Sequence, residues 1–209
     1  MNPGLNFLLD HPLVAILRGV PPHDVIAVAD ALFEAGFRVI EVPLNSPSPL
    51  QSIGLLAQHF NNNVLVGAGT VTTPAMAKDA MAAGAALILS PNFRRDVVEY
   101  SVANGAISMP GVATCSEAFD ALEAGAHALK VFPADVLGPE TFKAWSSVLP
   151  PQVPLFAVGG IHAENMARFR DAGAVGVGLG SSLYVPGLPI AELRSRAQIV
   201  FSKWLTTAP

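Results

Sequence analysis

The chain repeats one arrangement of hydrophobic and polar positions: an amphipathic segment, a break that pairs alanine with glycine, and a short apolar segment. The break occurs at residues 34–37, 82–85, 123–126 and 171–174, with a weaker copy at 103–106. Glycine at such a break suits the left-handed conformation that follows a helix end, and an apolar run starts within about three residues. The pattern therefore predicts repeated helix-to-strand units.

The repeat divides the chain into alternating strands and helices. The predicted strands are the eight short apolar runs at residues 14–18, 39–44, 64–67, 87–90, 106–110, 128–132, 155–159 and 175–179. The predicted helices are the amphipathic segments at residues 24–35, 49–60, 74–83, 94–103, 117–124, 139–148, 163–172 and 190–204. Strict alternation gives either a closed barrel or an open doubly wound sheet, and eight units favour the barrel. We predict the α/β class, a (β/α)8 TIM barrel that forms a single domain over residues 1–209.

Composition changes this picture by suggesting an oligomer. Hydrophobic residues make up 51% of the chain and charged residues only 13%, which indicates buried subunit surface as well as a buried core. The net charge is −4 and the basic residues are scattered, so we expect neither nucleic-acid nor membrane binding. Asp10 and His11 interrupt the N-terminal segment where a signal peptide needs an apolar run, so we expect a cytoplasmic protein.

Cysteine and histidine give little sign of metal chemistry. The single cysteine, Cys115, excludes an internal disulfide and a multi-thiolate site, and we interpret it as a packing residue. The five histidines lack the spacing that places two ligands on one helical face, and His162 is interpreted as a surface or helix-capping residue. We therefore expect no metal and no cofactor.

Candidate functional groups gather at one predicted end of the barrel. Catalytic groups in this fold sit at the carboxyl ends of strands. Polar residues and glycines occur within or just after each predicted strand, at Arg18, Glu41, Gly69-Thr70, Ser90-Pro91-Asn92, Pro110-Gly111, Lys130, Gly159-Gly160 and Gly178-Leu179-Gly180-Ser181-Ser182.

Lys130 lies inside an apolar run of strand type, His127 to Ala134. Burial of an ammonium group without a partner costs several kcal/mol, so the expected outcome is a lowered pKa and a neutral, nucleophilic amine. The alternative is that the amine pairs with a carboxylate or extends to the surface. The candidate groups on the other strands favour the nucleophile.

Glu41 shares a strand face with Val39 and Pro43, so burial at the barrel mouth is expected. A carboxyl group in such a pocket can have a raised pKa and exchange protons near neutrality. A structural ion pair with Arg18 is the alternative. A lysine nucleophile and a nearby carboxyl group suit Schiff-base chemistry on a ketone.

The glycine-rich ends of the seventh and eighth strands predict a phosphate site. Barrels of this class often bind phosphate there through backbone N–H groups. The alternative is that these glycines only permit tight turns. Their position after the last two strands favours a phosphorylated substrate.

Seven motifs in order along the chain resemble the class I 2-keto-3-deoxy-6-phospho-aldonate aldolases, the KDPG/KHG aldolase family. They are Ala15-Ile16-Leu17-Arg18-Gly19, Glu41-Val42-Pro43-Leu44-Asn45-Ser46-Pro47, Gly67-Ala68-Gly69-Thr70-Val71, Ser90-Pro91-Asn92, Pro110-Gly111, Leu129-Lys130-Val131-Phe132-Pro133 and Ala157-Val158-Gly159-Gly160. Members that act on the gluconate epimer usually carry threonine, arginine and threonine where this chain has Pro43, Asn45 and Val158. The resemblance is therefore to the members that act on the galactonate epimer.

The resemblance implies a role for each candidate residue. Lys130 forms the Schiff base, Glu41 moves protons directly or through a water, and Arg18 contacts substrate beside Glu41. The pyruvate carboxylate is held by Gly69 and Thr70. The phosphate is bound by the glycine-rich ends, at Gly159, Gly160, Gly180 and Ser181, and Val158 helps to set the preference at C4. The family forms trimers, so a homotrimer is expected.

The expected reaction is cleavage of 2-dehydro-3-deoxy-6-phospho-D-galactonate to pyruvate and D-glyceraldehyde 3-phosphate. Three alternatives stay open: the gluconate epimer as the main substrate, a phosphosugar isomerase, and a non-catalytic phosphosugar-binding protein on the same barrel. An isomerase would not need the strand lysine, and a binding protein would not need paired reactive groups.

Overall fold

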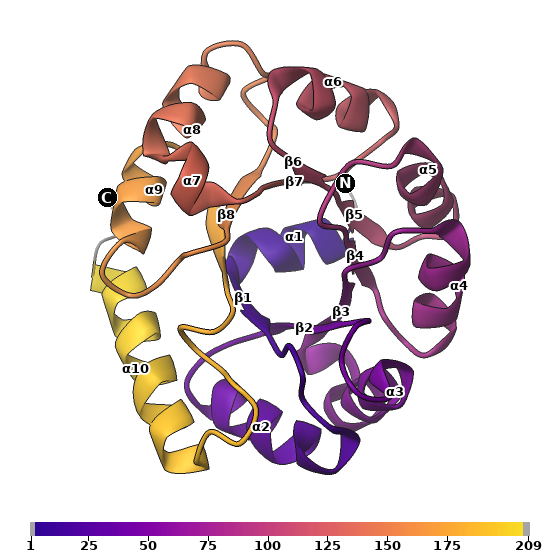
Figure 1. The fold of residues 1–209 in the computed structure, drawn as a ribbon, viewed down its shortest axis with the longest axis vertical. Coiled ribbons are helices and arrows are strands. Elements are labelled where there is room, and N and C mark those ends of the chain that lie inside the picture. Colours follow the sequence, from indigo (N-terminus) through magenta and orange to yellow (C-terminus); the bar gives the residue numbers. More distant parts are fainter. Residues whose placement is uncertain (1–2, 207–209) are drawn as a thin grey trace.

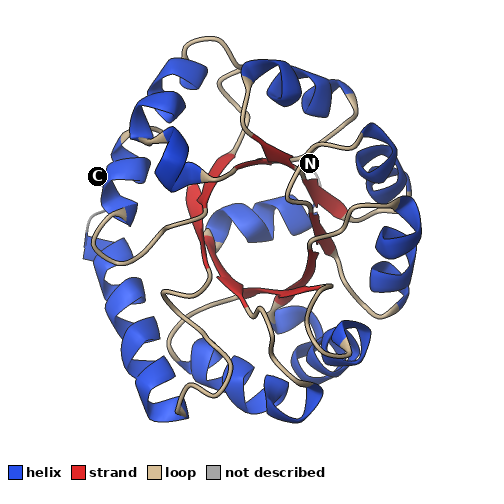
Figure 2. Cartoon of the chain, viewed as in Figure 1, coloured by secondary structure: helices blue, strands red, loops and turns tan. Residues whose placement is uncertain are grey.

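A computed structural model describes residues 3–206 and shows a barrel of parallel strands inside a ring of helices (Figures 1 and 2). The ends of the predicted 1–209 domain, residues 1–2 and 207–209, lie outside the described residues. The strands are β1 (Leu13–Ile16), β2 (Val39–Pro43), β3 (Leu65–Gly69), β4 (Leu87–Leu89), β5 (Ile107–Met109), β6 (Gly111–Val112), β7 (Leu129–Val131), β8 (Leu155–Val158) and β9 (Gly176–Leu179).

The helices follow the strands in chain order. They are α1 (Pro3–Asp10), α2 (Pro22–Glu34), α3 (Pro49–Phe60) with the 3₁₀ turn η1 (Asn61–Asn63), α4 (Pro74–Ala82), α5 (Arg95–Ala103), α6 (Cys115–Glu123), α7 (Ala134–Leu137), α8 (Pro139–Ser146), α9 (Met166–Asp171) and α10 (Ile190–Thr206). Among the described helices, none is long and apolar enough to cross a membrane.

The nine strands are the eight predicted ones, with the fifth divided at Pro110. The sheet order runs from β5 through β4, β3, β2, β1, β9, β8 and β7 to β6, and every pairing is parallel. Proline has no N–H to donate to a ladder, so the strand is interrupted there. The Pro110 carbonyl nevertheless accepts a hydrogen bond from Lys130 N at 2.9 Å, which continues the pairing of the fifth strand with β7. The predicted barrel is confirmed.

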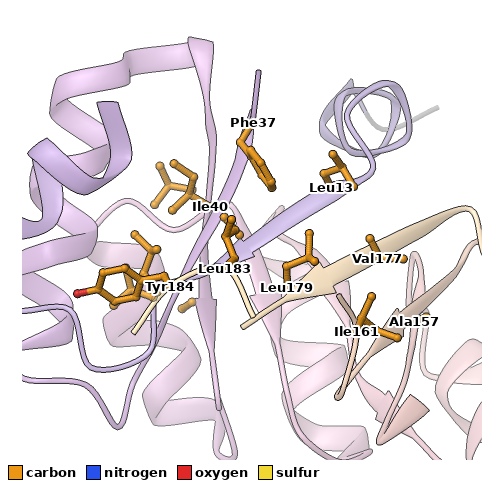
Figure 3. Packing of buried hydrophobic residues seen from close by; sticks show 14 of the residues in the cluster. Leu13, Phe37, Ile40, Ala157, Ile161, Val177, Leu179, Leu183 and Tyr184 are labelled. Carbon is orange, nitrogen blue, oxygen red and sulfur yellow. The ribbon is translucent and has the colours of Figure 1, made fainter. Parts of the chain in front are cut away.

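Two hydrophobic layers hold the barrel in place. The inner layer fills the ring of strands with side chains such as Val39 and Phe156, and Leu8 of α1 belongs to the same cluster. In Figure 1, α1 is seen through the ring of strands, where it closes the end opposite the carboxyl ends. The outer layer packs strands against helices, and Figure 3 shows Phe37, Ile40 and Leu179 within it.

The structure also corrects other predicted elements, of which the following affect the barrel or the site. Helices α1 and α7 were not predicted, and the helix predicted from residue 163 begins only at Met166. The loop before it is closed by Asn165, whose side-chain oxygen accepts the N–H of His162 at 2.9 Å. The first strand ends at Ile16 rather than at Arg18, which leaves Arg18 in the loop at the barrel mouth.

Candidate active site

A cavity of about 420 Å³ opens at the carboxyl ends of the strands. The residues that line it come from three regions: the end of β1 with the loops after β1, β3 and β4; β7 and the residue after it; and the ends of β8 and β9 with the loops that follow. They are Ile16, Arg18, Thr70, Pro91, Lys130, Phe132, Val158, Gly159, Gly160, Ile161, His162, Gly178, Gly180, Ser181 and Ser182. The cavity is large enough for a small phosphorylated sugar acid.

Lys130 is the middle residue of β7, and its side chain points into the barrel. Its neighbours two positions away, Ala128 and Phe132, belong to the inner hydrophobic layer, as strand alternation requires. The residue is 6% exposed, and Nζ lies 4.9 Å from the centre of the Phe132 ring. Burial lowers the pKa of Lys130, although the nearby Glu41 opposes this effect. The side chain does not extend to the surface, and its burial favours the uncharged amine.

Glu41 lies in β2, across from Ile16 of β1 and Gly67 of β3 in the strand register. It is 2% exposed, and its buried Oε2 atom has no hydrogen-bond partner among the described residues. Burial raises the pKa of Glu41, while the charges of Lys130 and Arg18 act in the opposite direction. Burial therefore favours the protonated carboxyl group, and a positive charge nearby favours the carboxylate, which is the behaviour of a group that exchanges protons.

Arg18 does not form the structural ion pair with Glu41 that the sequence left open. Its Nη1 atom instead donates a hydrogen bond to Asn45 Oδ1 at 2.6 Å. A second contact joins the same two loops, because Gly19 N donates to Ser46 Oγ at 2.9 Å. These bonds hold the guanidinium at the exposed mouth, near enough to influence both buried groups.

Gly69 ends β3 next to the carboxyl group of Glu41, and Thr70 follows it in the loop. A Cβ atom at Gly69 would overlap that carboxyl group, so glycine is needed for the close approach. Thr70 has φ 60°, a left-handed conformation that is costly for a β-branched residue. Strain of this kind is typical of residues that the surrounding structure holds in place for a functional reason.

The loops after β8 and β9 form the other wall of the cavity. Gly159 and Gly160 have φ values of 97° and 67°, which suit glycine. The Ser182 hydroxyl donates to the Ile161 carbonyl at 2.7 Å and ties the two loops together. The N–H groups of Gly160 and Ser181 make no backbone hydrogen bond within the described chain, so both can serve an anion.

The structure brings most of the predicted site residues to this one cavity. Arg18, Thr70, Lys130, Val158, Gly159, Gly160, Gly180 and Ser181 all line it. Glu41 and Gly69 do not line the cavity, but they are buried next to each other. Glu41 is also close enough to Lys130 for its charge to act on the lysine. In residues 3–206, no cluster of histidine, cysteine and carboxylate side chains is arranged to hold a metal.

His162 also lines the cavity, although the sequence interpretation placed it on the surface. Its side chain is indeed exposed, and it stands two positions after the glycine pair at the end of the seventh predicted strand. The closeness of His162 to Gly160 in the sequence could have predicted this position, because a short turn after Gly160 keeps the next side chains near the barrel mouth.

Comparison with known proteins agrees with this geometry. The family model for KDPG and KHG aldolase matches residues 6–191. The 2-dehydro-3-deoxy-6-phosphogalactonate aldolase of Escherichia coli (strain K12) is 44% identical over 89% of this chain and 91% of its own.

Two solved structures carry the same fold. The native KDPGal structure superimposes with a TM-score of 0.92 at 42% identity, covering 94% of this chain and 95% of that one. KDPG aldolase from Legionella pneumophila, with pyruvate captured at low pH as a covalent carbinolamine intermediate, gives 0.81 at 29% identity over 98% of both chains. These matches extend across the strands that carry Glu41 and Lys130. The chain belongs to the KDPG and KHG aldolase family and is a carbon–carbon lyase of the aldolase type.

Proposed function

We propose that this aldolase cleaves 2-dehydro-3-deoxy-6-phospho-D-galactonate to pyruvate and D-glyceraldehyde 3-phosphate through a Schiff base on Lys130. The observation that carries the proposal is the pairing of a buried lysine of lowered pKa with a buried carboxyl group of raised pKa at one barrel mouth. The relative at 44% identity carries the name of this galactonate activity.

The first steps need a neutral amine and a proton donor. Lys130 Nζ attacks the C2 ketone and gives a carbinolamine, whose hydroxyl must leave as water. Burial favours the uncharged forms of both Lys130 and Glu41, so the amine is nucleophilic and the carboxylic acid can supply the proton. Loss of water gives an iminium ion.

Formation of the iminium changes the charge on Lys130 from neutral to positive, and this changes the preferred state of Glu41. The iminium is the protonated Schiff base of Lys130, and its nitrogen carries a positive charge. A positive charge nearby favours the ionised form of Glu41. The carboxylate, directly or through a water, then removes the C4 hydroxyl proton.

Cleavage of the C3–C4 bond follows, with the iminium as electron acceptor. The electron pair of that bond forms an enamine, and D-glyceraldehyde 3-phosphate leaves as the aldehyde. The proton now on Glu41 passes to C3 and gives a new iminium. Water hydrolyses this iminium to release pyruvate and the neutral amine of Lys130, and the proton set free returns to the Glu41 carboxylate. The iminium supplies the electron sink, so the proposed route needs no cofactor.

The remaining roles follow from position around the cavity. We assign the pyruvate carboxylate to Thr70 and the Gly69 backbone, next to Glu41 and the cationic Arg18. The phosphoryl group is assigned to the opposite wall, to the backbone of Gly159, Gly160 and Gly180 and to Ser181. Val158, which lines the cavity, is assigned to the middle of the substrate at C4.

We further propose a homotrimer in the cytoplasm. The low charged fraction of the chain supports a buried subunit surface. Several large hydrophobic side chains are exposed in the described chain, among them Val136 at 78% and Ile199 at 48%. Light scattering coupled to size exclusion tests the subunit number, and a monomer would contradict it.

A pyruvate assay coupled to lactate dehydrogenase tests the reaction. The two epimeric 6-phosphorylated keto-deoxy acids should both be offered, and kcat/KM should be higher for the galactonate epimer. Higher kcat/KM on the gluconate epimer would transfer the main activity to that substrate. An isomerase or a binding protein would release no pyruvate from either acid.

A further inference from the structure

We propose that the imidazole of His162, held by Glu164, binds the phosphoryl group of the substrate. This inference rests on the proposed function, since it assumes a phosphorylated substrate in the cavity. It adds an imidazole side chain to a phosphate site otherwise made of backbone groups and a serine.

The main chain of His162 is already engaged, which leaves its side chain for a ligand. The His162 N–H donates to Asn165 Oδ1 at 2.9 Å, and its carbonyl accepts from Asn165 N and Met166 N, both at 3.1 Å. Asn165 Nδ2 also donates to the Gly160 carbonyl at 2.9 Å. These bonds fix the turn that carries the imidazole at the cavity wall.

The imidazole is oriented through one of its two nitrogens. Nδ1 lies 3.0 Å from Glu164 Oε2, and Glu164 Oε1 lies 3.2 Å from Lys203 Nζ on α10. Hydrogen bonds from His162 and Lys203 lower the pKa of Glu164, so its carboxylate stays ionised as the anchor. In the tautomer in which Nδ1 accepts the N–H of Glu164 at 3.3 Å, Nε2 carries the proton. Nε2 makes no hydrogen bond within residues 3–206 and is available to donate to a ligand.

The carboxyl group beside Gly160 explains why a further hydrogen-bond donor is needed. The carboxyl group of Asp135, on α7, packs so closely against Gly160 that a Cβ atom there would overlap it. A phosphoryl group carries a charge of about −1.5 to −2 near neutral pH, so this neighbour opposes its binding. The Nε2–H group of the imidazole on the same loop donates a further hydrogen bond to the phosphoryl group, which adds to the backbone contacts that must outweigh this repulsion.

The test compares His162→Ala and His162→Gln with the wild-type enzyme, using the phosphorylated acid, its unphosphorylated counterpart and inorganic phosphate as an inhibitor. For His162→Ala we expect KM for the phosphorylated acid to rise about 10- to 100-fold, because hydrogen bonds to charged groups contribute about 1.5–3 kcal/mol. Inhibition by phosphate should weaken by a similar factor, while kcat changes less than about threefold. His162→Gln, which keeps an N–H donor, should recover part of the loss.

The matched control is His23→Ala, which removes an exposed histidine whose recorded ion-pair partner is Asp24. It should leave all three measurements unchanged. Glu164→Gln should raise KM for the phosphorylated acid less than His162→Ala does, as expected of a positioning residue.

The outcomes separate the two proposals. Equal losses on the phosphorylated and unphosphorylated acids, or unchanged phosphate inhibition in His162→Ala, would overturn the role of His162 alone. If the wild-type enzyme releases no pyruvate from the phosphorylated acid, or shows no preference for it over the unphosphorylated one, the proposed function itself fails.

Discussion

The carboxyl group of Glu41 lies in the space that a side chain at Gly69 would occupy. Neighbouring strands of a barrel present inward residues side by side, and here β3 has glycine at both inward positions next to Glu41, at Gly67 and Gly69. The carboxyl group therefore stays inside the barrel mouth rather than turning to solvent, and burial raises its pKa.

Gly69→Ala should displace this carboxyl group and reduce kcat/KM by at least about 100-fold, because misplacement by about 1 Å is sufficient for such a loss. Pyruvate release in a steady-state assay measures the effect. The control is Gly54→Ala in α3, where an added Cβ atom meets its nearest neighbour, the Ala83 carbonyl, at an ordinary 3.6 Å. Activity near the wild-type level in Gly69→Ala would show that the position of Glu41 is not critical.

Glu41→Gln should lower kcat by about 10²–10⁴-fold, the usual contribution of a general acid–base group. The amide keeps the size of the side chain but cannot exchange a proton. Imine formation with pyruvate should remain detectable, so borohydride trapping followed by mass spectrometry separates loss of proton transfer from loss of the nucleophile. Full turnover in this variant would remove Glu41 from the mechanism.

Lys130→Met should stabilise the folded protein by about 1–3 kcal/mol at pH 7, as replacement of buried ionisable groups often does. Burial lowers the pKa of Lys130, so the unfolded chain binds a proton there at pH values where the folded chain does not. Between the lowered pKa and about pH 10.4, the lysine destabilises the fold, and this destabilisation becomes smaller as the pH rises.

Urea unfolding of Lys130→Met at several pH values measures this effect. The control is Lys143→Met, because Lys143 is exposed and its ion pair with Glu140 is long, at 3.9 Å. That variant should change stability by no more than about 0.5 kcal/mol. If Lys130 and Glu41 were instead a charged buried pair, Lys130→Met would destabilise the protein by about 3–5 kcal/mol.

Val158→Thr should shift the ratio of kcat/KM values toward the gluconate epimer by about 10- to 200-fold, the range that one methyl-sized change in a pocket produces. The Val158 side chain packs against Gly178 and lines the cavity, so a hydroxyl group there would face the substrate. Initial rates on both epimers give the ratio. An unchanged ratio would mean that other residues set the preference at C4.

Much of the fold could be predicted because the sequence marks it locally. The alanine–glycine breaks end helices, and the apolar runs between them became the strands of the barrel. The helix α7 could not be predicted, since four residues are too few to show a helical period. Helix α1 has an apolar face, but this face covers the end of a barrel built from strands that are distant in the sequence. Its packing partner could therefore not be read from the neighbouring residues.

The site was predictable in its chemistry and less so in its contacts. Strand alternation is enough to turn Glu41 and Lys130 inward. It does not reveal that Arg18 binds Asn45 rather than Glu41, because that bond joins two loops whose conformations the sequence does not specify. The left-handed conformation of Thr70 and the position of His162 depend on loops in the same way.

Treatment of the enzyme with pyruvate and borohydride, followed by peptide mass spectrometry, identifies the residue that forms the Schiff base. We expect a reduced pyruvyl adduct on Lys130 in the wild-type enzyme and none in Lys130→Met, together with loss of aldol cleavage in that variant. An adduct on another lysine, or normal turnover by Lys130→Met, would exclude Lys130 as the nucleophile.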